Sequence, residues 1–112
     1  MKKLKPVTPG DILLEDFLKP MGLSQYRLAK EIGVPPQRIG DIVSGKRSIT
    51  ADTDLRLSKF FGLSNGYWLR AQAAYDTEVA ERELRPILTK IRPWTTVVAQ
   101  LRHPSVRIHR SG

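Results

Sequence analysis

The chain has 112 residues, enough for one compact domain with a modest core and too few for a large multi-step enzyme. It has no cysteine and only two histidines, which excludes disulfides, thiolate nucleophiles and cysteine-ligated metals, and we expect neither a metal nor a cofactor. The 19 Lys and Arg against 11 Asp and Glu give a net charge of +8, which favours a polyanionic partner such as nucleic acid.

The positive charge is concentrated towards the C-terminus. Residues 1–84 hold 13 basic and 11 acidic residues, whereas residues 85–112 hold six basic residues and no acidic one. We therefore expect a domain over 1–84 and a basic extension over 85–112, which either contacts nucleic acid or only solubilises the chain. No apolar run is long enough for a membrane span and no signal-peptide core is present, so a cytoplasmic protein is expected.

Helical periodicity and helix-stop signals predict five short helices in the first eighty residues. The first helix should begin after Thr8 as N-cap, with Pro9 at its first position, where a missing N–H does no harm. Pro20 should end this helix near Leu18, because the residue before a proline is disfavoured in the helical region.

The second and third helices are separated by only a few residues. Ser24 can cap the second helix, which Gly33 closes, and Pro36 begins a third helix that continues to Ser44 before Gly45. Two short helices joined by so sharp a turn are typical of a helix-turn-helix, whose second helix can lie in the major groove of DNA.

Four further elements complete the prediction. Thr50 should cap a fourth helix that ends at Gly62, and Ser64 should cap a fifth that carries Trp68. A short sixth helix is expected to start around Pro86, and β-branched residues favour a C-terminal strand over 95–101. The predicted fold is all-α, with a five-helix helix-turn-helix domain followed by these two short elements.

The third helix has an apolar face and a polar face. Its inward side chains are Ile39, Ile42 and Val43. The opposite face and its flanks present three candidate base-reading side chains, Gln37, Arg38 and Asp41. Gln can bind adenine and Arg can bind guanine through two hydrogen bonds, whereas Asp can only accept. Because Asp41 follows the other two by four and three residues, it either orients them or accepts directly from a base.

Phosphate contacts need donors at the edges of the groove. The tandem prolines remove two N–H groups from the start of the third helix, so the N-terminus of the second helix must supply backbone donors. Candidate phosphate-contacting side chains on this helix and in the loop after the third helix are Ser24, Gln25, Arg27, Lys46 and Arg47. Alternatively, Lys46 and Arg47 only solvate the loop, and Gln37 and Arg38 are ordinary polar surface residues. The sequence contains no catalytic constellation, and we expect no enzymatic activity.

Several motifs together resemble one family. The motifs are Val7-Thr8-Pro9-Gly10, Gly22-Leu23-Ser24-Gln25-Tyr26-Arg27-Leu28-Ala29, Ile32-Gly33-Val34-Pro35, the stretch 45–53, Tyr67-Trp68-Leu69 and Gln72-Ala73-Ala74-Tyr75-Asp76. Over residues 5–82 the chain resembles the HigA-type addiction-module antitoxins, which belong to the phage-repressor-like helix-turn-helix proteins. The combination of motifs is far more specific than a helix-turn-helix alone.

The resemblance implies a homodimer that binds double-stranded operator DNA, represses its own operon and neutralises a RelE-like toxin, a ribosome-dependent mRNA endonuclease. Ser44 also lies on the outer face of the third helix by helical periodicity and is expected to contact phosphate, and the resemblance implies a DNA contact there as well. The acidic residues late in the fifth helix are candidates for toxin binding or form a solvated face; they are Asp76, Glu78, Glu81 and Glu83. Tyr75 and Val79 could line a dimer or toxin surface, whereas Trp68 is expected in the core.

Two other functions stay open. The chain could be a stand-alone repressor without a toxin, or a protein-interaction module that has lost DNA binding, as Asp41 and the tandem prolines would allow. Gly40 departs from the family pattern and costs up to about 1 kcal/mol of helix propensity. It either permits close backbone approach to DNA or is simply tolerated.

Overall fold

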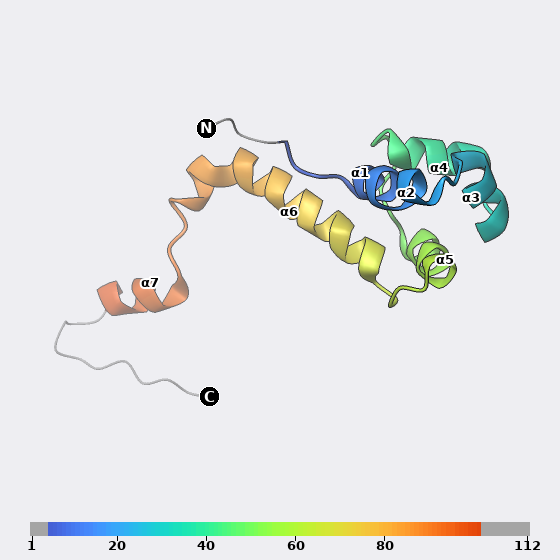
Figure 1. Cartoon of the computed structure of the whole chain (residues 1–112). Helices are drawn as coiled ribbons and strands as arrows, with labels where there is room; N and C mark the ends of the chain where they lie inside the picture. The colour runs from blue at the N-terminus through green and yellow to red at the C-terminus, as the bar shows by residue number, and fades with distance from the viewer. Residues whose placement is uncertain (1–4, 102–112) are drawn as a thin grey trace. The chain divides into compact units, whose positions relative to one another are not determined.

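The computed structural model describes residues 5–101, and every regular element in that range is a helix (Figure 1). In chain order the elements are α1 (Pro9–Ile12), η1 (Leu13–Leu18), α2 (Lys19–Met21), α3 (Gln25–Ile32), α4 (Pro36–Val43), α5 (Ala51–Phe61), α6 (Tyr67–Leu88) and α7 (Trp94–Leu101). The all-α prediction is confirmed. The chain divides into two compact units between Ala80 and Glu81.

The first helix does not end at Leu18 as predicted but runs through α1, η1 and α2 to Met21. In η1 the backbone forms π-helical turns, and the N–H of Lys19 donates to the carbonyl five residues back, at Leu14. This change of register puts Pro20 in the first turn of α2, where a missing N–H breaks no helical bond. Gly22 then ends the helix with a left-handed φ of 61°.

The predicted N-caps of the first, second and fourth helices are confirmed. Thr8 and Asp11 form a reciprocal capping box at α1, Ser24 accepts from the N–H of Arg27 at α3, and Thr50 accepts from the N–H of Thr53 at α5. These caps satisfy backbone donors that would otherwise lack partners. Local chemistry therefore fixes where each of these helices begins.

The start of α6 is capped differently from the prediction. Ser64 lies before the helix, and the carboxylate of Asp54, buried in α5, caps it instead. Its two oxygens accept from the N–H groups of Gly66 at 2.7 Å, Trp68 at 2.8 Å and Leu69 at 3.3 Å. A buried carboxylate is stable there because backbone donors and the positive end of the helix dipole surround it.

One core holds the first unit together. Its completely buried apolar side chains are Leu13, Leu28, Ala29, Ile39, Leu57 and Trp68. The indole of Trp68, placed in the core as predicted, packs against the ring of Phe17 with centroids 5.2 Å apart, and Phe17 packs on Phe61 at 4.7 Å. Tyr75 and Val79, further along α6, are only half-buried. The core therefore gathers side chains from η1, α3, α4, α5 and α6.

The second unit differs from the prediction in two places. Residues from Pro86 onward do not begin a separate helix, because Pro86 lies in the last turn of α6 and removes only one backbone bond there. The strand over 95–101 is also wrong: these residues form α7, in which Trp94, Val97, Val98 and Leu101 follow helical spacing. A helix satisfies its own backbone, whereas a strand needs a partner strand. Arg102, Arg107 and Arg110 of the basic extension lie outside the described residues.

None of the helices in the described part of the chain combines the length and apolar character needed to cross a membrane. Within the second unit, the large apolar side chains are mostly exposed; these are Leu84, Ile87, Leu88, Ile91, Trp94 and Leu101.

Gly10 brings the start of the first helix into direct contact with the end of α4. Gly10 is buried, and a Cβ atom at this position would overlap the carbonyl oxygen of Ile42 and lie 2.9 Å from the Cα of Val43. Both neighbours are backbone atoms, which cannot move aside as a flexible side chain can. Only glycine lets the first helix brace α4 at this distance.

We expect Gly10→Ala to lower the free energy of unfolding by about 1–3 kcal/mol or more, because the added methyl overpacks a backbone contact. Urea denaturation of wild type and variant measures this. Gly40→Ala is the matched control, since a Cβ there would meet only the Oε1 of Gln25 at 3.7 Å. That variant should be neutral or more stable by up to about 1 kcal/mol. Equal effects of the two substitutions would contradict the account.

Candidate nucleic-acid interface

The helix α4 has one buried and one open side. Ile39 and Ile42 are completely buried or nearly so, at 0% and 1% exposure, and Val43 packs half-buried beside them. On the other side Gln37 is exposed and Asp41 half-buried. The predicted division of this helix into an apolar inner face and a polar outer face is therefore present.

Gln37 and Asp41 are joined across one turn of α4. The side-chain amide of Gln37 donates to Oδ1 of Asp41 over 2.9 Å. This is the orienting contact predicted from their spacing, and it is made with Gln37 and not with Arg38. The bond leaves the carbonyl oxygen of Gln37 and the second carboxylate oxygen of Asp41 as acceptors, together with one amide hydrogen of Gln37 as a donor.

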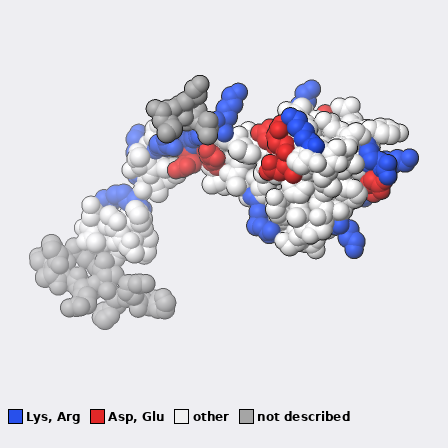
Figure 2. All heavy atoms as spheres, in the orientation of Figure 1, with Lys and Arg blue, Asp and Glu red and all other residues white. Residues whose placement is uncertain are grey.

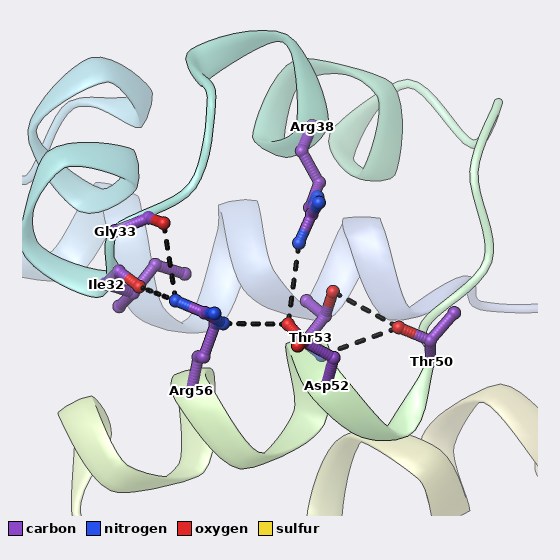
Figure 3. A network of polar contacts seen from close by, with 7 residues as sticks. All are labelled: Ile32, Gly33, Arg38, Thr50, Asp52, Thr53 and Arg56. Atoms are coloured by element: carbon purple, nitrogen blue, oxygen red, sulfur yellow. Dashed lines mark hydrogen bonds and ion pairs between the residues drawn. The ribbon is translucent and has the colours of Figure 1, made fainter.

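Arg38 turns away from this pair and towards α5. Its Nη1 lies 3.5 Å from Oδ1 of Asp52, its side chain is 26% exposed, and its Nε is buried without an acceptor. Figure 3 shows the guanidinium reaching from α4 to the first turn of α5. The structure therefore brings two of the three candidate base-reading residues together, Gln37 and Asp41. The side chain of the third, Arg38, lies against the neighbouring helix α5.

Arg56 fastens the helix-turn-helix to α5. Its Nε donates to Oδ1 of Asp52 at 2.7 Å, and its Nη1 donates to the carbonyl oxygens of Ile32 at 2.8 Å and Gly33 at 3.3 Å (Figure 3). Those carbonyls belong to the C-terminal end of α3, where helical acceptors lack intrahelical partners. The guanidinium therefore caps α3 while its carboxylate partner touches α4.

Sequence reasoning missed Asp52 and Arg56. Their spacing of four residues indicates an ion pair on one helix face, but nothing local links that pair to Arg38 or to the carbonyls of α3. Such contacts depend on how α5 packs across the turn.

The three predicted phosphate-contacting residues of α3 lie at its N-terminal end. The hydroxyl of Ser24 caps the helix by accepting from the N–H of Arg27 at 3.0 Å. The Nε of Arg27 donates to Glu31 one turn later at 2.6 Å, so part of its charge is paired within α3. Gln25 is half-buried and lies next to Gly40 of α4. Of the three residues, Gln25 therefore borders α4.

The loop after α4 contains the remaining three predicted phosphate-contacting residues, Ser44, Lys46 and Arg47. The carbonyl oxygen of Asp41 accepts from the hydroxyl of Ser44 at 3.2 Å and from the N–H groups of Lys46 at 2.8 Å and Arg47 at 3.1 Å. The loop is fixed further along, where the N–H of Ile49 donates to Gln72 of α6 at 2.8 Å. Its backbone is thus held in place while the Lys46 and Arg47 side chains are exposed.

Charge does not gather into a single basic patch on the face shown in Figure 2, where Lys and Arg side chains stand apart and acidic groups lie between some of them. The four candidate toxin-binding residues are all exposed along α6: Asp76, Glu78, Glu81 and Glu83. Asp76 accepts from the amide of Gln72 at 3.0 Å. The break between the two units falls between Glu78 and Glu81.

Comparison of the chain with known proteins identifies its family. A helix-turn-helix family model matches residues 14–68. Virulence-associated protein I of Dichelobacter nodosus is 48% identical over 85 residues, which cover 76% of this chain and 79% of that protein. An addiction-module antidote protein of the HigA family from Coxiella burnetii has 40% identity and a TM-score of 0.74, covering 81% of this chain and all of that one. The chain belongs to the HigA-type helix-turn-helix family.

A second structure in this HigA-type group was determined with nucleic acid. The Pseudomonas aeruginosa antitoxin HigA with its higBA promoter is 32% identical, with a TM-score of 0.74, over 80% of this chain and 99% of that one. The relatives whose names carry a role are antitoxins and transcriptional regulators, in agreement with the prediction that this HigA-type chain is not an enzyme.

We expect Arg56→Met to lower the free energy of unfolding by about 1–2 kcal/mol, because it keeps the apolar stem but removes the charge-assisted bonds to the end of α3. Urea denaturation measures the loss. Lys59→Met on the same helix removes one positive charge at an exposed site and serves as control. If both variants unfold at the same urea concentration, Arg56 does not hold the turn.

Proposed function

We propose that this protein is the antitoxin of a type II toxin-antitoxin module, a homodimeric repressor that binds the operator of its own operon and neutralises a RelE-like toxin. The observation that carries the DNA-binding part is the polar outer face of α4, supported on its other side by the core. The Pseudomonas aeruginosa HigA structure with its promoter supports the same assignment by family membership.

In this proposal α4 of each subunit enters the major groove, and the two half-sites are one DNA turn apart or a multiple of it. Gln37 and Asp41 act as one hydrogen-bonded unit on base edges, and Arg38 adds a guanine-binding group. The phosphate-contacting set is Ser24, Gln25, Arg27, Ser44, Lys46 and Arg47. The basic extension over 85–112 adds charge that favours DNA.

The toxin-binding part rests on charge. Four exposed acidic residues lie on α6, well after α4 in the sequence: Asp76, Glu78, Glu81 and Glu83. Their negative charge is complementary to the positive charge of a basic ribonuclease.

We predict that Gln37→Ala and Lys46→Ala affect DNA binding differently. Loss of Gln37 should weaken operator binding by about 1–3 kcal/mol while leaving scrambled DNA nearly unaffected, because a base contact is lost. Loss of Lys46 should weaken both duplexes alike and reduce the salt slope by about 0.9, because one phosphate contact is lost. Gel retardation of both duplexes over a series of salt concentrations measures this, and equal losses for both variants on both duplexes would refute the division of roles.

We predict that the double variant Glu81→Gln with Glu83→Gln binds the protein encoded by the adjacent gene roughly three- to tenfold more weakly, because exposed charge pairs contribute little each. Calorimetric titration at low salt measures the affinity. The control, Glu15→Gln with Asp16→Asn, removes the same charge from the first helix, where both residues are exposed. Equal weakening by both pairs, or no complex with wild type, would count against this surface; the latter result favours a stand-alone repressor.

A further inference from the structure

Asp52 is shared by two arginines that it holds unequally. Its Oδ1 accepts from the Nε of Arg56 at 2.7 Å and lies 3.5 Å from the Nη1 of Arg38 (Figure 3). Arg56 is also bonded to two carbonyl oxygens of α3, so several contacts fix it. Arg38 makes one long contact to an exposed carboxylate, and contacts of this kind are weak.

The position of Arg38 on Asp52 leaves its guanidinium poorly satisfied. The Nε atom is buried and donates to nothing, although a buried donor without an acceptor is unfavourable. Arg38 lies in the first turn of α4 and belongs to the predicted base-reading set. It therefore has more to gain from a new acceptor than Arg56 has, and it is the member of the network that can leave.

We propose that Asp52 is a positioning residue that holds Arg38 away from DNA in the free protein and thereby limits the operator affinity of α4; this inference rests on the proposed DNA-binding function. To reach DNA, Arg38 must give up Asp52. Two hydrogen bonds from Arg38 to the N7 and O6 of a guanine compensate for the lost contact with Asp52. A single contact with a backbone phosphate compensates for it less completely.

Asp52→Asn tests this restraint. Asparagine has nearly the same shape and keeps an Oδ1 acceptor for Arg56, while it removes the charge that holds Arg38. Affinities for an operator duplex and a scrambled duplex are measured at several salt concentrations. The variant should bind the operator duplex about two- to fivefold more tightly, because the contact that Arg38 must break is weak. It should gain less on scrambled DNA, where Arg38 finds no guanine pair of acceptors, so the ratio of operator to scrambled affinity should rise.

Two comparisons separate this restraint from a general effect of charge or folding. Asp16→Asn also removes one negative charge at an exposed site of the first unit and should leave the affinity ratio unchanged. In a protein that already carries Arg38→Ala, adding Asp52→Asn should leave the ratio unchanged as well, because Asp52 acts through Arg38. Urea denaturation of every variant confirms that the folded state is the one measured.

The inference is overturned if Asp52→Asn keeps the wild-type ratio or lowers it, if Asp16→Asn raises it equally, or if the rise persists without Arg38. In each of those results wild type still prefers operator DNA, so the proposed function stands. If wild type binds neither duplex, or both alike, the proposed function and the inference fail together.

Discussion

The burial of Ile39 and Ile42 is the constraint on which the rest of the structure depends. Both side chains are in the core, so α4 cannot turn about its axis without exposing them, and its polar side must face outward. The same helix is braced at its end by Gly10, where two backbones meet without an intervening side chain. A short helix of eight residues would be marginal alone, and these tertiary contacts give it a fixed orientation.

Polar contacts then order the outer face of α4 in the free protein. Asp41 holds the amide of Gln37 and, through its backbone carbonyl, the loop that carries Lys46. Arg56 ties the end of α3 to α5. Side chains and loops that are already ordered lose less conformational entropy on binding, which favours affinity without additional contacts. These contacts keep the outer side of α4 rigid, as the proposed DNA surface requires.

Much of this fold could be predicted from the sequence because its signals are local. Caps such as Ser24, stops such as Gly33 and the apolar spacing within α4 act over a few residues, and the structure agrees with each. Two features that the sequence did not predict depend on a partner distant in sequence and on an unusual helical hydrogen-bond register. Asp54 caps α6 from 12 to 15 residues away, and the π-helical turns before Pro20 have no simple sequence signature. Likewise, the spacing within α4 gives the face on which a side chain begins, but not that a long side chain such as Arg38 bends onto α5.

The central claim is that the outer side of α4 is the surface that meets nucleic acid. The most direct measurement is an NMR titration of isotope-labelled protein with a duplex from upstream of its own coding sequence. The account predicts that amide signals from the start of α3, from α4 and from the loop through Arg47 shift together and saturate at one stoichiometry. Shifts confined to α6, with the signals of α4 unchanged at saturating duplex, would contradict it.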